Sequence, residues 1–248
     1  MPRTRVTAVL GRAPSGVSIR PFLCEDERGR ILYVKPFGSL PDSLISEWLA
    51  ARLARELGLP IPDFDLVDLP VELCRAAGHS DLKPGPAFAS VSLGPGAADV
   101  QPRDQGRIRP GILAETLVFD AWIQNADRIL GPLGGNPNAM MVSPGSRFFL
   151  IDHDNGFDPE WNQGGLPQLH LARQQAAHWL NSSHRAEWLA RARKAFDKFD
   201  VFWQELPPDW LQGVQERRPT FRSQVLDILR LPFDAPDEFW TIFHPNSP

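Results

Sequence analysis

The sequence has few cysteines, little net charge and no long apolar run, and each shortage excludes a class of protein. Cys24 and Cys74 are the two cysteines, and neither belongs to a CxxC pair, so the chain offers no disulfide framework and no cysteine zinc site. The formal net charge is -4, with lysine and arginine scattered along the chain, which disfavours nucleic-acid binding. No apolar run approaches the roughly 20 residues that cross a bilayer, and the N-terminal segment lacks the apolar centre of a signal peptide. We therefore expect a cytoplasmic protein without a membrane span.

The chain does contain enough apolar material for a folded core. Its 248 residues are 42% hydrophobic and 23% charged. These values allow one large domain or two small lobes, each with its own buried core.

The N-terminal part contains two β-prone segments and one clear helix. Residues 17–25 and 31–35 are separated by the turn-forming DERGR and predict an antiparallel hairpin. The segment 43–57, SLISEWLAARLAREL, has apolar residues at helical spacing and is followed by Gly58, so it predicts a helix. The proline-punctuated LPIPDFDLVDLPVEL predicts one or two further strands and a connector.

The remainder predicts a loop region followed by a mostly helical part. Residues 78–111 hold many glycines and prolines with little periodicity, which indicates a long loop region. ILAETLVFDAWIQNA, 112–126, predicts a helix, and AMMV and RFFLI, joined by SPGS, predict a hairpin. From residue 166 onward the pattern is largely helical. The expected fold class is α+β, with an N-terminal lobe over 1–75, a connecting loop region over 76–111 and a helical C-terminal lobe over 112–248.

Oxygen-bearing side chains are concentrated around the predicted hairpin. Asp127, Asn136 and Asn138 precede its first strand, and Asp152 and Asp154 follow its second. Mg²⁺ is a hard ion that favours carboxylate and amide oxygens, so asparagine and aspartate at the two ends of one hairpin suit a metal and phosphate site. Phosphoryl transfer needs such a site because its catalysis is mostly positioning and neutralisation of phosphate charge.

Two residues of the N-terminal part complete the parts that phosphoryl transfer requires. Lys35 ends the strand ILYVK, where a lysine can hold phosphates. Glu47 lies in the helix that follows and can reach back to Lys35. We predict an ion pair between them, because the order strand, turn and helix lets the helix pack over the sheet. Read singly, each of these residues also fits an ordinary solvated surface or turn position.

The segments ILYVKPF, SEWLAARLARELGLPIP, AWIQNADR, GNPNAMM and FFLIDHDNGF together resemble the HipA-like kinases, and more distantly the phosphatidylinositol kinases. The resemblance covers about residues 10–157. It implies a two-lobed protein-kinase-like fold with ATP between the lobes, Mg²⁺ as cofactor and transfer of the γ-phosphate, with a protein serine or threonine as the family-based acceptor. By position it implies that Lys35 binds phosphate, Asp127 is the catalytic aspartate, Asn136 is a metal ligand and Asp152 is the counterpart of the DFG aspartate.

The sequence departs from the kinase pattern at three places. Asn136 lies nine positions after Asp127 instead of five, so the loop must bulge, and Asn136 and Asn138 are both candidates for the metal, with Asn136 favoured. GRAPSG offers Gly11 and Gly16 as the nearest substitute for a glycine-rich nucleotide loop. His153 and Asp154 stand where the kinase motif has Phe-Gly, so Asp154 can share or replace the metal role of Asp152.

Two other classes of function stay open from the sequence. A pseudokinase-like module would bind nucleotide or a partner without transferring phosphate, and the long glycine-rich insertion after Asp127 favours that alternative. A purely structural or partner-binding protein would leave the ordered series of acidic and amide side chains unexplained. A lipid head group or a small molecule also remains open as the acceptor.

Overall fold

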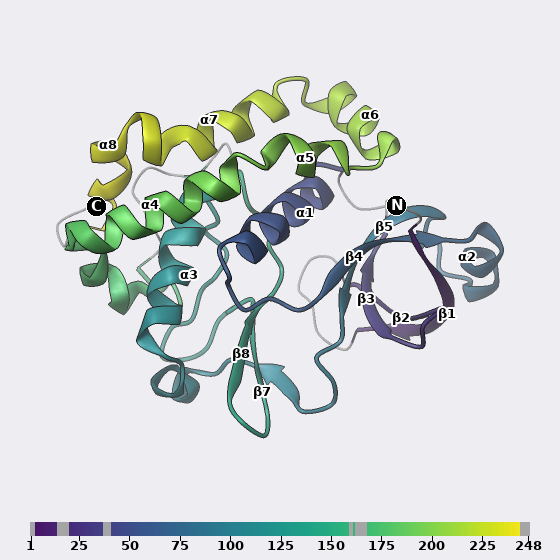
Figure 1. The fold of residues 1–248 in the computed structure, drawn as a ribbon. Helices are drawn as coiled ribbons and strands as arrows, with labels where there is room; N and C mark the ends of the chain where they lie inside the picture. The colour runs from purple at the N-terminus through teal and green to yellow at the C-terminus, as the bar shows by residue number, and fades with distance from the viewer. Residues whose placement is uncertain (1–2, 14–19, 37–40, 159–160, 162–167, 244–248) are drawn as a thin grey trace.

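The structure is a computed structural model that describes residues 3–13, 20–36, 41–158, 161 and 168–243. It combines a closed five-stranded barrel with a helical part and a small three-stranded sheet (Figure 1). The chain is therefore a mixed α and β protein, as the sequence predicts. Among the described helices, none has both the length and the apolar character needed to cross a membrane.

The barrel strands follow the order β1-β2-β3-β5-β4, and β1 closes the barrel by pairing with β4 in parallel. The other neighbouring pairs are antiparallel. Their bounds are β1 Thr4–Arg12, β2 Phe22–Asp26, β3 Ile31–Lys35, β4 Phe64–Leu69 and β5 Gly85–Val91.

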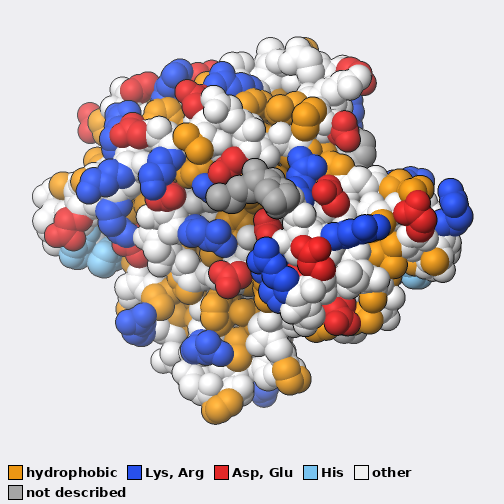
Figure 2. Space-filling view, turned by 45° about the vertical axis from the view of Figure 1, so that its right-hand side comes forward, with side chains coloured by type: hydrophobic (Ala, Val, Ile, Leu, Met, Phe, Trp, Pro, Cys, Tyr) orange, Lys and Arg blue, Asp and Glu red, His pale blue; other side chains and the backbone are white. Residues whose placement is uncertain are grey.

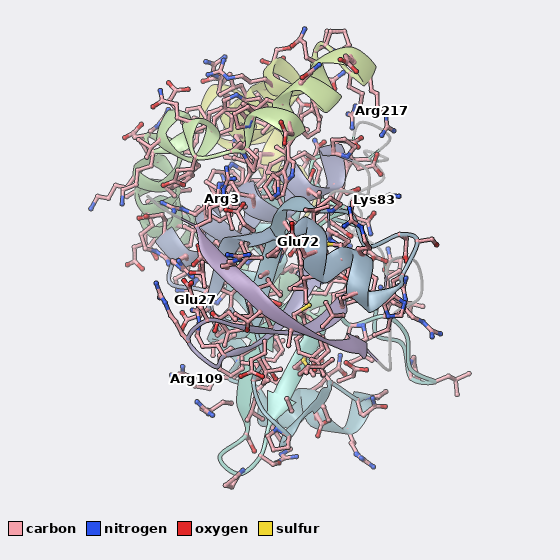
Figure 3. All side chains as sticks on the ribbon, turned by 90° about the vertical axis from the view of Figure 1, so that its right-hand side faces the viewer. Arg3, Glu27, Glu72, Lys83, Arg109 and Arg217 are labelled. Atoms are coloured by element: carbon pink, nitrogen blue, oxygen red, sulfur yellow. The ribbon has the colours of Figure 1, made fainter. Side chains whose placement is uncertain are left out.

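The barrel encloses its own apolar core, because alternate side chains of a strand point to the same face. Cys24, Leu32, Val34 and Ala89 are all fully buried in it. Helix α2, Val71–Ala77, adds the buried Cys74 to the same cluster. Figure 3 looks onto this side of the molecule, with Glu72 of α2 labelled.

Helix α1, Pro41–Glu56, lies between the barrel and the remaining helices (Figure 1). Its interior position explains why most of its residues are buried, including Leu49 and Leu53 at 0% exposure. Gly58 follows it with φ of 75°, a left-handed conformation that glycine adopts without strain and that ends a helix. The predicted helix over 43–57 is confirmed, with its start two residues earlier.

The small sheet has the order β6-β7-β8, with β6 Ala97–Asp99, β7 Ala139–Val142 and β8 Arg147–Leu150. The predicted hairpin is confirmed, because β7 and β8 pair antiparallel with Ala139 opposite Leu150. The hairpin places the segments before β7 and after β8 side by side.

The helical part packs around a cluster of large aromatic side chains. Trp122 meets Trp188 edge-on with ring centroids 5.5 Å apart, and Trp188 stacks on Phe239 at 5.8 Å. The predicted helical C-terminal part is confirmed. Its elements are α3 Pro110–Trp122, the 3-10 helix η2 Arg173–Leu180, α4 Ser182–Phe196, α5 Phe199–Gln204, α6 Pro208–Arg217, α7 Phe221–Asp234 and α8 Pro236–Thr241.

Three expectations about secondary structure are wrong. The region 78–111 is not one long loop, because it contains β5, β6, the 3-10 helix η1 Pro102–Arg107 and the start of α3. Helix α3 ends at Trp122, four residues before the predicted end at residue 126, and Gln124 then takes a positive φ of 51°. The strand predicted over 17–25 does not include residues 20 and 21, because β2 starts at Phe22; residues 17–19 lie outside the described residues.

The visible surface carries charges of both signs. Figure 2 shows lysine and arginine intermixed with aspartate and glutamate on that face. This mixture agrees with the small net charge of -4.

Candidate active site

A cavity of about 340 Å³ opens between the barrel strands, α1 and the two segments that flank the β7–β8 hairpin. One part of its wall is apolar and the other part is polar. The apolar wall includes Ile61, Phe64, Phe88, Val91, Leu93, Met140 and Leu150. The polar part includes Lys35, Glu47, Asp127, Asn136, Asn138, Asp152 and Asp154. An apolar cavity with a few convergent polar groups is the usual form of a small-molecule site.

Lys35 lies at the centre of the polar part. Its Nζ donates to Glu47 Oε2 at 2.7 Å, to Asp152 Oδ1 at 2.5 Å and to Asp154 Oδ2 at 3.1 Å. The predicted ion pair between Lys35 and Glu47 is confirmed. It forms because β3 ends at Lys35 while α1 packs beside the barrel.

The electrostatics of this group follow from burial and mutual charge. Burial alone would lower the pKa of Lys35, but Glu47, Asp152 and Asp154 outweigh it and hold that pKa well above its usual value. Burial would raise the pKa of Glu47, but Lys35 and His153 more than offset it, so the pKa of Glu47 lies below its usual range. Lys35 and Glu47 are therefore a charged pair at neutral pH.

The carboxylates of Glu47, Asp152 and Asp154 form a compact acidic group, with one oxygen from each lying within 4.8 Å of the others. Burial raises the pKa of Asp154 to about 7, and the negative charges of Asp152 and Glu47 add to it while Lys35 opposes it. Hard oxygen ligands at this spacing fit a divalent cation such as Mg²⁺.

The turn that carries Asp152 is fixed against α1. Asp152 follows β8 with a positive φ of 56°, an unusual conformation for a residue other than glycine. The backbone N–H of His153 donates to both carboxylate oxygens of Glu47 at 3.1 Å. Glu47 thus holds Lys35 on one side and the Asp152 turn on the other.

Asp127 is surrounded by amide donors. Its Oδ2 accepts hydrogen bonds from Asn136 at 3.0 Å, Asn138 at 3.0 Å and Asn155 at 2.9 Å. Both candidate asparagines therefore lie beside Asp127, and the structure does not favour one over the other. Sequence reasoning missed Asn155, although it directly follows Asp154 in the same segment.

The insertion after Asp127 folds out as a small hairpin, which confirms the predicted bulge. The N–H of Ile129 donates to Asn136 O at 2.8 Å, and Gly131 and Gly134 exchange two backbone hydrogen bonds at 3.0 Å. The hairpin returns the chain to its starting point. Asn136 therefore reaches Asp127 despite the spacing of nine positions.

One of the two glycines proposed for nucleotide binding, Gly11, is not among the residues that line the cavity. Gly11 lies within β1 beside an irregularity in its pairing with β2, and it does not line the cavity. Gly16 lies outside the described residues.

A lysine held by a glutamate, next to aspartate and asparagine side chains at one end of an apolar-walled cavity, is the arrangement that kinase-type phosphotransferases use. A family model described as HipA-like kinase matches residues 6–243. The chain belongs to the HipA-like kinase family, which confirms the resemblance seen in the sequence.

Two solved structures can be compared with this chain. A proinflammatory kinase of Helicobacter pylori, CtkA, is 11% identical with a TM-score of 0.55, over 98% of each chain, so the two share a fold. HipA of Shewanella oneidensis, solved with HipB and operator DNA, is 14% identical with a TM-score of 0.45, over 89% of this chain and 65% of that one. No curated protein sequence matches the chain.

Proposed function

We propose that the protein is an ATP- and Mg²⁺-dependent kinase that transfers the γ-phosphate to a hydroxyl group, with a protein serine or threonine as the acceptor. The proposal includes a two-lobed protein-kinase-like arrangement with the nucleotide between the lobes. Because β5 pairs with β3 and β4, we extend the proposed N-terminal lobe from residue 75 to Val91. Residues 92–111 then connect it to the helical lobe over 112–248.

The observation that carries this proposal is the contact of Lys35 with Glu47, Asp152 and Asp154 at the polar end of the cavity. Burying a lysine among carboxylates costs desolvation free energy. Such groups are therefore found more often at functional sites than elsewhere. Phosphate oxygens and a divalent cation are the ligands that would use both signs of charge. The apolar wall with Phe64 and Phe88 suits the adenine ring.

Each residue has a distinct role under the proposal. Lys35 binds phosphate oxygens, and Glu47 orients Lys35. Asp152 and Asp154, with Asn136 or Asn138, would hold Mg²⁺, which would supply positive charge to neutralise the phosphates. Contacts of Lys35 with both aspartates must then be exchanged for contacts with the nucleotide, because its ammonium lies among the carboxylates.

Asp127 is the proposed catalytic residue. Three amides donate to its Oδ2, so the orientation of its carboxylate is set before an acceptor arrives. Asp127 orients the acceptor hydroxyl and accepts its proton, while the acceptor oxygen bonds to the γ-phosphorus and the bond to the ADP oxygen breaks.

Nucleotide binding and phosphate transfer test the proposal separately. We expect ATP to raise the unfolding temperature more with Mg²⁺ than without it, and radiolabelled γ-phosphate to be transferred to proteins of a cell extract. Asp152→Asn should weaken Mg²⁺-dependent binding as well as transfer, whereas Asp127→Asn should keep binding and lose most transfer. Asp209→Asn on α6, an exposed aspartate, is the matched control and should behave as wild type.

Each remaining outcome has a definite meaning. If the wild type binds MgATP but never transfers phosphate, the pseudokinase alternative replaces the kinase proposal. If both Asp127→Asn and Asp152→Asn keep full activity, the assignment of these residues is wrong.

A further inference from the structure

A second group of charged and polar residues contacts the segments that carry the site, and none of its members lines the cavity. Its centre is Asp120 of α3, whose side chain is fully buried. Arg128 Nε donates to Asp120 Oδ2 at 2.7 Å and Arg128 Nη2 donates to Oδ1 at 3.3 Å. His170 and Asn125 also contact this carboxylate, each at 3.0 Å. A buried carboxylate with this many donors is fully paired.

Arg128 extends the network to the two segments that flank the β7–β8 hairpin. Its Nη1 donates to the backbone carbonyl of Asn138. The same nitrogen donates to the backbone carbonyl of Ile151 at 3.3 Å. Asn138 is a candidate metal ligand, and Ile151 directly precedes Asp152. One guanidinium therefore joins the segment before β7 to the segment after β8, using the planar fork of donors that arginine has and lysine lacks.

Asn125 extends the network to Asp127. Its Nδ2 donates to Asp120 Oδ1 at 3.0 Å, while its Oδ1 accepts from the backbone N–H of Asp127 at 3.2 Å. The short segment between α3 and Asp127 is thus held at its middle by the same carboxylate.

His170 links the network to residues 169–171, whose backbone runs beside residues 128–130. Its Nδ1 accepts from the N–H of Ala172 at 3.1 Å, so this nitrogen carries no proton and Nε2–H is the group that donates to Asp120. The backbone around it pairs with the loop, because Leu171 donates to Arg128 O at 2.9 Å and Leu130 donates to Leu169 O at 2.8 Å.

We propose that Asp120, Arg128 and Asn125 are positioning residues that hold Asp127, Asn138 and Asp152 in one fixed arrangement. None of the three touches the cavity as a lining residue. They act through backbone atoms of the site segments, which sets the mutual spacing of the proposed catalytic and metal-binding groups. The proposal rests on the proposed function for its effect on transfer, but not for its effect on the backbone.

Hydrogen exchange measured by mass spectrometry on the nucleotide-free protein tests the backbone effect without requiring activity. Arg128→Lys keeps the charge next to Asp120 but cannot make all the contacts of the guanidinium. We expect faster exchange in the segments around Asn138 and Ile151 together, with β1 to β5 unchanged.

The matched control is Arg30→Lys in the barrel. Arg30 also pairs with a buried aspartate, since its Nε lies 2.7 Å from Asp26 Oδ2, but neither residue lines the cavity. Arg30→Lys should speed exchange near Asp26 and leave the site segments unchanged. If Arg128→Lys exchanges at the site segments like wild type, the proposal is overturned.

Asn125→Ala provides an independent variant, because it removes a link to Asp127 without stranding a buried charge. We expect faster exchange at Asp127, a fall in kcat of about tenfold or more because a small misplacement of a reacting group is costly, and a nearly unchanged KM for MgATP. A merely structural role would lower the amount of active protein and would not separate kcat from KM in this way.

Asn125→Ala also decides the question if Arg128→Lys fails to fold. Wild-type exchange at Asp127 together with kcat within twofold of wild type would overturn the proposal. If the wild-type protein transfers no phosphate at all, the proposed function fails, while the exchange measurements still decide whether the network positions the site.

Discussion

Replacing Lys35 by methionine should destabilise the protein strongly, because it strands three carboxylates without their shared cation. The side chains of Lys35 and Glu47 are 11% and 4% exposed, and their charged atoms are 2.7 Å apart. Coulomb's law at an effective dielectric constant of about 20 gives roughly 6 kcal/mol for such a pair, before the cost of desolvating both ions. Removing one partner of a buried pair typically costs about 3–5 kcal/mol, which we take as the expected loss in the free energy of unfolding.

A double-mutant cycle makes this prediction specific to the pair. Glu47→Leu removes the charge that Lys35→Met leaves stranded, so the double variant should be more stable than Lys35→Met alone by about 1–3 kcal/mol. Recovery should be incomplete, because Asp152 and Asp154 also lose their contact with Lys35.

Urea unfolding at pH 7.5, followed by tryptophan fluorescence, measures these free energies. Lys194→Met on α4 is the matched control, since Lys194 is exposed and the substitution is the same. If Lys35→Met costs no more than Lys194→Met, the buried ion pair does not exist in solution and the reasoning is refuted.

Three further predictions concern pH, packing and the insertion. Folding raises the pKa of Asp154 from 3.8 to about 7, so the ionised carboxylate destabilises the fold above pH 7 and this cost disappears as the pH falls toward 4. Asp154→Asn should therefore raise the melting temperature in EDTA at pH 8 but not at pH 4.5. Equal increases at the two pH values would contradict this prediction. Leu49→Ala, in the buried centre of α1, should cost about 2–5 kcal/mol in urea unfolding, whereas Leu133→Ala, at a fully exposed position, should change it by less than about 0.5 kcal/mol. A Cβ on Gly135 would lie 2.5 Å from Ile129 O, whereas a Cβ on Gly106 would meet nothing within 4 Å. Gly135→Ala should therefore weaken Mg²⁺-dependent ATP binding measured by calorimetry, and Gly106→Ala should not. Equal affinities of the two variants would show that the insertion does not hold Asn136 in place.

The elements that the sequence predicts well are those with a strong local signal. The helix 41–56 combines apolar periodicity with a terminal glycine, and the strand 31–35 is short, β-prone and followed by proline. The pairing of Lys35 with Glu47 could be predicted because these two elements are adjacent in the chain. The cluster of Asp127, Asn136 and Asp152 could be predicted because one hairpin separates them.

The elements that the sequence did not reveal depend on contacts between distant segments. No strand was expected over Thr4–Arg12 or Gly85–Val91, yet both belong to the closed barrel. The second has small residues and a proline near its start, and its middle is buried without alternation, so no period of two marks it. Asp120 and Arg128 look like ordinary helix and loop charges until the fold places them together.

The insertion between Asp127 and Asn136 makes chain length and site geometry independent of each other. Backbone hydrogen bonds close the base of the insertion, and Leu133 at its tip is fully exposed. The site geometry therefore does not depend on Pro132 or Leu133. The native Cys24 and Cys74 are both buried, so Leu133→Cys would offer a single accessible thiol for a fluorophore. Such a label would lie a few residues from the proposed catalytic aspartate, and its fluorescence could report binding of the nucleotide or the acceptor in real time.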